Sequence, residues 1–418
     1  MMTLAAAPEQ DTRRKLPPGW RWVRLGEVCD VNPRRPPNFE RPDGAPTTFV
    51  PMSAVDARSG TVARPEVRPF AEVKKGYTCF GTEDVLFAKI TPCMQNGKHA
   101  IARGLIDGVG FGTTEFHVLR PGPQVIPEWI HYYVRQPAVL TDATTYFIGS
   151  AGQQRLPDSY LGAMEIPFPP LEEQKRIAAI LNEQMAAVER ARTAAEAQLQ
   201  TAKALPTAYL RAIFNSPEAQ QWPTRRLIEV CELLPSKSIA TDGDRAVLAV
   251  TTACLTEAGF DPSGVKSARM WAQDVGECVL SPGEILVARS NTPELVGRVA
   301  MYAGDPAGVV ASDLTIRIRP KDSLEPPFLT AYLSFLYMTG YWKDRAGGAS
   351  GSMKKITRSQ IEQERVPVPP MTEQQRIVGY LAERMAASDT TRKALQEQLA
   401  DINSLPAALL RQAFSGKL

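Results

Sequence analysis

The feature that most constrains this chain is a repeat. The segment "VPVPPMTEQQRI" begins at Val366, and the similar segment "IPFPPLEEQKRI" begins two hundred positions earlier, at Ile166. When residues 166–216 are laid over residues 366–416 without a gap, 22 of the 51 positions are identical. Unrelated segments of average composition would share only a handful. The chain is therefore a tandem duplication, and its fold is expected to contain each element twice.

Weaker matches precede both copies of this repeat. They pair "WRWVRLGEVC" with "WPTRRLIEVC", "DVLFAKITPCMQNGKHA" with "EILVARSNTPELVGRVA", and "PEWIHYYV" with "PPFLTAYL". Each half thus joins a variable globular part to a better-matched helical part. The boundaries that we expect are an N-terminal tail at 1–17, a globular domain at 18–167, a helical segment at 168–216, a second globular domain at 217–367 and a second helical segment at 368–418.

The variable parts are expected to be mixed α/β. In "LTIRIRP", apolar residues alternate with polar ones from Leu314, as in a half-buried strand. The run "EILVA" at 284–288 is typical of a buried strand, and "PEWIHYYV" has Pro127 where a helix would begin. Many Gly, Pro and Asp residues separate these short elements.

The repeated parts are expected to be long helices. The paired prolines end an extended segment, and Thr372 with Gln375 fits a capping box, whereas the first copy has Glu172 in the cap position. Apolar residues then recur about every 3.5 positions, as at Leu381 and Met385. Since no proline appears before Pro206 or its counterpart, each helix is expected to have about 30 residues and a length of roughly 45 Å.

Two matched helices in one chain pack most simply on each other. We therefore expect an α/β fold with two mixed α/β domains in a pseudo-two-fold arrangement, separated by two long antiparallel coiled-coil helices. The interval between the domains would correspond to roughly 13 base pairs of duplex DNA.

Composition narrows the class of protein. A net charge of +3 tolerates nucleic acid as a partner without arguing for it. The six cysteines form no CxxC pair, which favours reduced thiols, and three histidines are too few and dispersed to indicate a metal centre. No apolar run is long enough to span a membrane and the N-terminus has no signal-peptide core, so we expect a cytoplasmic protein.

Motifs for catalysis are not found. The stretch "VNPRRPP" is not the Pro-Pro loop with which an amino-methyltransferase holds a flipped base, and no GxxxxGK[ST] phosphate loop occurs. The stretch "GVGFG" at 108–112 is expected to be a turn before a strand. Asp43, with Glu72 and Lys74, imitates a nuclease metal motif at a loose spacing that the second half lacks, so we attribute it to chance.

The doubled Pro-Pro-x-x-Glu-Gln-x-x-Ile motif, placed between variable domains, resembles the specificity subunit of type I restriction–modification enzymes. The resemblance extends from about Pro17 to the C-terminus. It implies that each variable domain is a target recognition domain reading one half of a split, asymmetric site in double-stranded DNA. It also implies that the helices set the gap and dock two methyltransferase (modification) subunits, which motor/nuclease restriction subunits can join. The subunit itself would have no catalytic residue and no cofactor, since S-adenosylmethionine, ATP and Mg²⁺ would belong to its partners.

Within that resemblance, DNA contacts are expected on basic and amide side chains in loops. Basic residues matched between the halves are better candidates for phosphate contacts, and unmatched polar residues for base reading; a solvated surface charge is an equally good reading of each. The candidates are Lys89, Arg289, Lys98, Arg298, Gln95, Asn96, Gln153, Gln154, Arg155, Asn291, Lys354 and Lys355.

The helical copies supply the candidates for the helix seam and for partner docking. Ordinary core packing is the simplest reading of their apolar members, and a solvated edge position is an equally good reading of Arg192 and Arg392. The set is Gln174, Arg176, Leu181, Met185, Arg192, Leu199, Gln374, Arg376, Leu381, Met385, Arg392 and Leu399.

Two other classes of function stay open. One is an enzyme with a fused methyltransferase or nuclease, against which the missing motifs argue. The other is a non-catalytic coiled-coil scaffold or adapter of a methylation-only DNA system, against which the matched basic loops argue.

Overall fold

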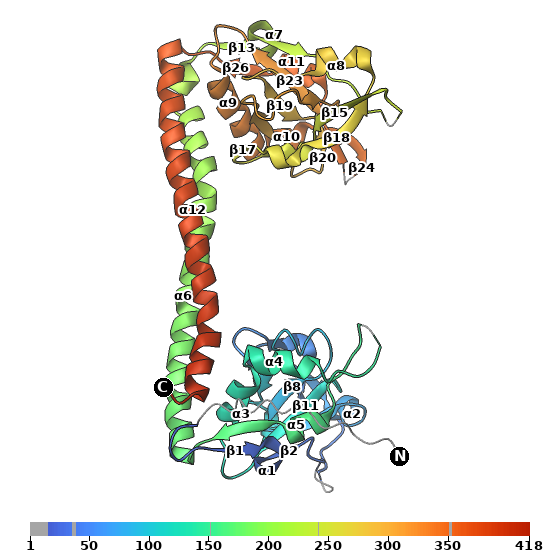
Figure 1. Cartoon of the computed structure of the whole chain (residues 1–418), viewed down its shortest axis with the longest axis vertical. Helices are drawn as coiled ribbons and strands as arrows, with labels where there is room; N and C mark the ends of the chain where they lie inside the picture. Colours follow the sequence, from blue (N-terminus) through green and yellow to red (C-terminus); the bar gives the residue numbers. More distant parts are fainter. Residues whose placement is uncertain (1–15, 36–38, 151, 241, 351–352) are drawn as a thin grey trace. The chain divides into compact units, whose positions relative to one another are not determined.

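The structure is a computed structural model, and it describes residues 16–35, 39–150, 152–240, 242–350 and 353–418. The expected N-terminal tail lies outside these residues up to position 15. The chain divides into two compact units, Met1–Glu196 with Glu397–Leu418, and Ala197–Gln396. Each unit combines one globular domain with parts of two long helices, α6 (Leu171–Phe214) and α12 (Met371–Phe414) (Figure 1).

The globular part of the first unit is mixed α/β, as expected. Two four-stranded sheets have the strand orders β6-β3-β10-β7 and β2-β11-β8-β9, and β1 pairs with β12. Its elements are β1 (Arg21–Arg24), α1 (Leu25–Val28), β2 (Cys29–Val31), β3 (Pro46–Val50), β4 (Val55–Asp56), β5 (Thr61–Val62), β6 (Glu66–Pro69), α2 (Phe70–Val73), β7 (Thr78–Gly81), β8 (Val85–Ala88), β9 (His99–Ile101), β10 (Val109–Gly112), β11 (Phe116–Pro121), α3 (Pro127–Val134), α4 (Pro137–Thr144), α5 (Asp158–Ala163) and β12 (Glu165–Phe168).

The second unit repeats this topology. Its sheet β14-β23-β19-β21 matches β2-β11-β8-β9, and β18-β15-β22 matches β6-β3-β10. Its elements are β13 (Thr224–Arg226), α7 (Leu227–Val230), β14 (Cys231–Leu234), β15 (Arg245–Val250), β16 (Leu255–Thr256), β17 (Gly259–Phe260), β18 (Lys266–Met270), α8 (Ala272–Cys278), β19 (Ile285–Ala288), β20 (Ser290–Asn291), β21 (Val299–Met301), β22 (Val310–Ala311), β23 (Thr315–Pro320), α9 (Pro326–Met338), α10 (Tyr341–Arg345), β24 (Gly347–Ser350), β25 (Met353–Lys355), α11 (Arg358–Gln363) and β26 (Arg365–Pro367). The duplication seen in the sequence is therefore a duplication of the fold.

Apolar runs form the centre of each matched sheet. All four residues of β8 and all four of β19 are buried, because their sheets are covered on both faces. The expected strand in "LTIRIRP" is β23, and the expected helix that begins at Pro127 is α3. The stretch "GVGFG" is a turn followed by β10, as predicted.

The long helices differ from the sequence-based expectation at their C-terminal ends. Both run for 44 residues, about 66 Å, and continue through Pro206 and Pro406 rather than ending there. A proline inside a helix costs about 3 kcal/mol because it removes one hydrogen bond. The last two turns offset this cost by burying Leu210 and Phe214 in the second unit and Phe414 in the first.

The capping box predicted at Thr372 and Gln375 is wrong. Helix α12 begins one residue earlier, at Met371, so Thr372 lies inside the first turn, and α6 likewise begins before Glu172. The carbonyl of Pro370 accepts hydrogen bonds from the N–H groups of Glu373 and Gln374. It therefore satisfies first-turn N–H groups, which is the role expected of a side-chain cap.

The two long helices run antiparallel within each unit, as expected. In the first unit, Leu181 near the beginning of α6 shares a core with Leu410 near the end of α12. In the second unit, Leu210 near the end of α6 shares a core with Leu381 near the beginning of α12. Among the described residues, no helix combines the length and the apolar character needed to cross a membrane.

Candidate nucleic-acid interface

Two loops that carry predicted DNA-contact residues meet in the first unit. One loop follows β8 and begins at Lys89, and the other contains Gln153, Gln154 and Arg155. The backbone carbonyl of Lys89 accepts a hydrogen bond from the N–H of Leu156 at 2.9 Å, and the carbonyl of Gln154 accepts one from Thr91 at 3.0 Å. An isolated β-bridge joins Ile90 to Arg155. The fold thus unites residues more than sixty positions apart in the sequence.

The second unit builds the same junction. The carbonyl of Arg289 accepts a hydrogen bond from the N–H of Ile356 at 2.8 Å. Strand β20 then pairs antiparallel with β25, which places Asn291 opposite Lys354. Four of the predicted residues therefore converge in the first unit (Lys89 and Gln153–Arg155), and four in the second (Arg289, Asn291, Lys354 and Lys355).

Exposure separates the amide and basic residues of these loops. Gln95 and Asn96 are exposed in the turn that follows β8, and Gln153 is exposed at the tip of the partner loop, whereas Gln154 is half-buried. In the second unit Lys355 is exposed, while Asn291 and Lys354 are half-buried. The exposed members have the freedom to reach a groove edge or a phosphate.

The charge of the two junctions differs because of one carboxylate. Arg155 donates to both oxygens of Glu115, at 2.9 Å and 2.7 Å, and this pair lowers the pKa of the Glu115 carboxyl. Glu115 was not among the residues predicted from the sequence. The backbone carbonyl at 115 accepts from Lys89, and the equivalent carbonyl of Leu314 accepts from Arg289. This match of position 115 with position 314 would have identified Glu115 as the residue that faces the basic loop.

Lys98 and Arg298 have a matched role inside their own units. The ammonium of Lys98 donates to the carbonyls of Met52 at 3.0 Å and Val55 at 3.1 Å. The guanidinium of Arg298 donates to the carbonyl of Leu255 at 3.3 Å, at the position equivalent to Val55. Their similarity is explained by this internal anchor, and a phosphate contact by either residue stays a prediction.

The glutamines assigned to the helix seam are not open to a partner. Gln174 and Gln374 have no exposed surface, and each side chain bonds to the globular part of its own unit. They lie in the seam between a long helix and a globular domain. Docking of another subunit through their side chains is therefore not the reason for their repetition.

The other seam residues fall into two classes. Leu181, Leu199 and Leu381 are buried, with Met185, Met385 and Leu399 half-buried, which is ordinary core packing. Arg176 and Arg376 are exposed and pair with the glutamate three positions earlier, at 2.7 Å and 2.6 Å. Arg192 is buried, whereas Arg392 is half-exposed and pairs with Asp389.

Several titratable residues of the globular parts have pKa values shifted by burial, as is usual for side chains packed in a core. Burial raises the pKa of the Cys29 and Cys231 thiols to about 12 and lowers that of His99 to about 3. Lys74 is ion-paired with Asp43 at 2.5 Å, so the two ends of the loose nuclease motif do meet, but they meet as a salt bridge. Within the described parts of the chain, no three His, Cys, Asp or Glu side chains gather as a metal site would require.

Comparison with known proteins shows the same duplication. The family model described as "Type I restriction modification DNA specificity domain" matches residues 17–197 and again residues 220–400. The specificity subunit of the type I restriction enzyme EcoEI of Escherichia coli is 39% identical over 170 residues, which are 40% of this chain and 28% of that protein. The EcoKI subunit of E. coli K12 is 25% identical over 319 residues, 72% of this chain and 68% of that protein.

Solved structures agree. A chain from work on complex assembly and conformational transition of the type I R-M system superposes with a TM-score of 0.77 at 26% identity, covering 97% of this chain and all of that one. The HsdS subunit from Thermoanaerobacter tengcongensis gives a TM-score of 0.63 at 25% identity, covering 98% of this chain and all of that one. The matched segment spans only about 28% of the EcoEI subunit, but the two matches of the family model together cover most of this chain. The chain therefore belongs to the family of type I restriction–modification DNA specificity subunits.

Proposed function

We propose that this chain is the DNA-binding specificity subunit of a type I restriction–modification complex. Each globular domain would read one half of a split, asymmetric target. The observation that carries this proposal is the paired junction of two basic loops, which is built once in each unit on the same hydrogen-bond framework. The framework is shared while the side chains on it differ, as a reader of two different half-sites requires.

We assign the roles of individual residues from two properties: whether a residue is matched between the two halves, and whether its side chain is exposed. Lys89 and Arg289 are matched, so we assign them to phosphates, which carry no sequence information. Gln95, Asn96 and Gln153 are exposed and unmatched, so we assign them to base edges in the first half-site. In the second half-site, Asn291 and Lys354 take that part, whereas Lys355 is matched with Arg155 and is assigned to a phosphate.

The long helices would set the gap between the two half-sites and dock two copies of a methyltransferase subunit. Their exposed faces carry ion-paired residues such as Arg176 and Arg376, which remain available to a partner in both copies. Restriction subunits with motor and nuclease activity would be further partners. The chain would act in the cytoplasm, without catalysis or a cofactor of its own, because methylation and cleavage would reside in those subunits.

The decisive experiment is to co-express the chain with the methyltransferase encoded beside it and to map methylated bases by single-molecule sequencing. The expected result is methylation confined to a two-part motif with a fixed gap. Exchanging one globular domain for that of a relative should change one half of the motif only. A soluble complex that methylates nothing would instead support the scaffold function, and a continuous motif would overturn the two-reader model.

A further inference from the structure

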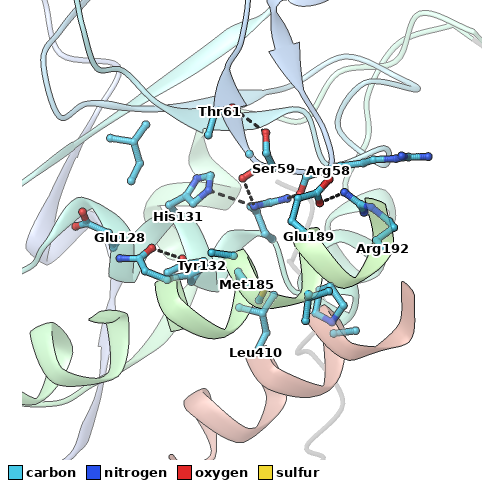
Figure 2. A pocket seen from close by; sticks show the side chains of 18 of the residues that line it. Arg58, Ser59, Thr61, Glu128, His131, Tyr132, Met185, Glu189, Arg192 and Leu410 are labelled. Carbon is cyan, nitrogen blue, oxygen red and sulfur yellow. Dashed lines mark hydrogen bonds and ion pairs between the residues drawn. The ribbon is translucent and has the colours of Figure 1, made fainter. Parts of the chain in front are cut away.

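A pocket of about 630 Å³ lies inside the first unit, and the function proposed above does not use it (Figure 2). Helix α3 contributes His131 and Tyr132 to its wall, α6 contributes six residues between Asn182 and Arg192, and the last turns of α12 contribute Leu410. The hairpin of β4 and β5 closes another side. The volume lies in the range of sites that hold a small organic molecule.

Positive charge exceeds negative charge on the pocket wall. Four arginines line it, at 58, 103, 135 and 192, against the two glutamates 128 and 189. Arg103 is neutralised by Glu83 and Glu128, and Arg58 pairs with Glu196, beside the wall, at 3.4 Å. Arg135 has no carboxylate partner among the described residues, and its donors bind the carbonyls of Ala57, Arg58 and Ser59. A half-buried guanidinium that meets only neutral carbonyls leaves a charge to be balanced.

Two polar side chains on this wall are buried and incompletely paired. Arg192 is only 9% exposed; its Nη2 meets Glu189, while its buried Nε finds no acceptor in the described part of the chain. His131 is 5% exposed and receives a hydrogen bond on Nε2 from Arg135 at 3.4 Å. Burial lowers the pKa of His131 well below its usual value, so its ring is neutral and its proton sits on Nδ1. That Nδ1 is buried and lacks an acceptor in the same described residues.

The second unit does not repeat this chemistry. The register of "PEWIHYYV" on "PPFLTAYL" places Thr330 where the first unit has His131, and Ser334 where it has Arg135. This register is fixed in space, because Tyr133 and Tyr332 donate to equivalent carbonyls at 165 and 365. His131 and Arg135 are therefore no part of the shared framework that both units need for folding, whereas Arg192 has a counterpart in Arg392.

We propose that this pocket binds a small phosphate-bearing molecule, with its phosphoryl group held by Arg192 and Arg135. Phosphate oxygens are acceptors that match the planar fork of a guanidinium, and they would also serve the unpartnered donor of His131. The apolar side chains of Met185, Val188 and Leu410 leave room beside the phosphoryl group for an organic body. The inference stands apart from the proposed reading of DNA, and either can fail without the other.

The test is isothermal titration of the full chain with inorganic phosphate, in chloride buffer of constant ionic strength. We expect saturable binding that Arg192→Gln weakens about tenfold or more, the effect of losing one charged hydrogen bond. Arg392→Gln is the matched control, because Arg392 holds the same place in the second helical copy and should leave binding within about twofold. Absence of saturable binding, or an equal loss in both variants, would overturn the proposal.

Further variants identify the group that is bound. His131→Asn keeps a donor near the position of Nδ1 and should retain binding, whereas His131→Leu should lose it. A parallel titration with adenosine monophosphate distinguishes the sources of the phosphoryl group. Tighter binding than that of inorganic phosphate, blocked by Ala186→Phe but not by Ala386→Phe, identifies an ester with an organic body; equal binding of both probes identifies the free ion.

Discussion

Gln174 and Gln374 make the same three hydrogen bonds, two hundred positions apart. The side-chain oxygen of Gln174 accepts from the N–H of Ile126 at 3.1 Å, and that of Gln374 accepts from Glu325 at 2.9 Å. Each side-chain amide nitrogen also donates to two backbone carbonyls at 2.9–3.0 Å. One belongs to the first proline of the Pro-Pro pair (Pro169 or Pro369), and the other to the loop before α3 or α9. The repeated Pro-Pro-x-x-Glu-Gln stretch is thus a joint that fixes a long helix to its globular domain.

Removal of this joint should destabilise the unit that contains it. Gln174→Ala leaves three backbone groups without their side-chain partner, of which the carbonyl of Pro169 is buried, so we expect it to lower the free energy of unfolding by about 2 kcal/mol. Gln375→Ala is the control, because Gln375 is exposed and its side chain bonds to Glu325 at the surface; its effect should stay within about 0.5 kcal/mol. Urea unfolding followed by circular dichroism measures both effects. Equal unfolding midpoints for the two variants would refute the proposal that Gln174 fixes the helix to its domain.

A buried ion network distinguishes the second unit. Arg317 is 1% exposed and donates to Glu284 at 3.0 Å and to three backbone carbonyls, whereas the first unit has Val118 at this position of its sheet. Arg317→Ala would leave the three carbonyls without this donor and Glu284 with Arg319 alone, so we expect a loss of about 3–5 kcal/mol. Val118→Ala removes two methyl groups at the matched site and should cost about 1–2 kcal/mol. Thermal unfolding should therefore show a larger fall for the arginine variant, and similar falls would contradict the network.

The basic junction of the second unit can be tested by charge reversal. Lys355→Glu should weaken binding of the assembled methyltransferase to its target DNA by at least tenfold. It should also reduce the slope of log affinity against log salt concentration by the amount expected for about one to two phosphate contacts. Lys321→Glu is the control, because Lys321 follows the opposite end of β23 from the junction. Fluorescence anisotropy at several salt concentrations gives both quantities. Parallel loss in the two variants would indicate general electrostatics rather than a local contact.

The repeat and the binary pattern of apolar residues predicted most of this fold. Strands β19 and β23, helix α3 and the antiparallel helices within each unit follow from local periodicity and from the duplication. The helix ends were missed because packing of Phe214 and Phe414 overrides the local cost of a proline. The match of Lys98 with Arg298 was visible, but its cause was not, since the carbonyls that they bind lie more than forty positions away. The pairing of the basic loops depends likewise on backbone hydrogen bonds between distant segments, which no single-sequence pattern reveals.

The three histidines, all in the first unit, predict an acid sensitivity that the second unit does not share. Burial lowers the pKa of His99 to about 3, and it also lowers the pKa of His117 and His131. Below the ordinary histidine pKa of 6.5 the unfolded chain binds protons that the folded unit does not. Stability should therefore fall as the pH decreases from 6.5 towards 3, by about 1.4 kcal/mol per pH unit for His99, and the lowered pKa values of His117 and His131 act in the same direction. His99→Asn keeps an acceptor for the N–H of Ala88 and should reduce that slope by about one proton. Chemical unfolding between pH 7 and pH 5 measures the slope, and an unchanged slope in the variant would mean that His99 is protonated in the folded protein.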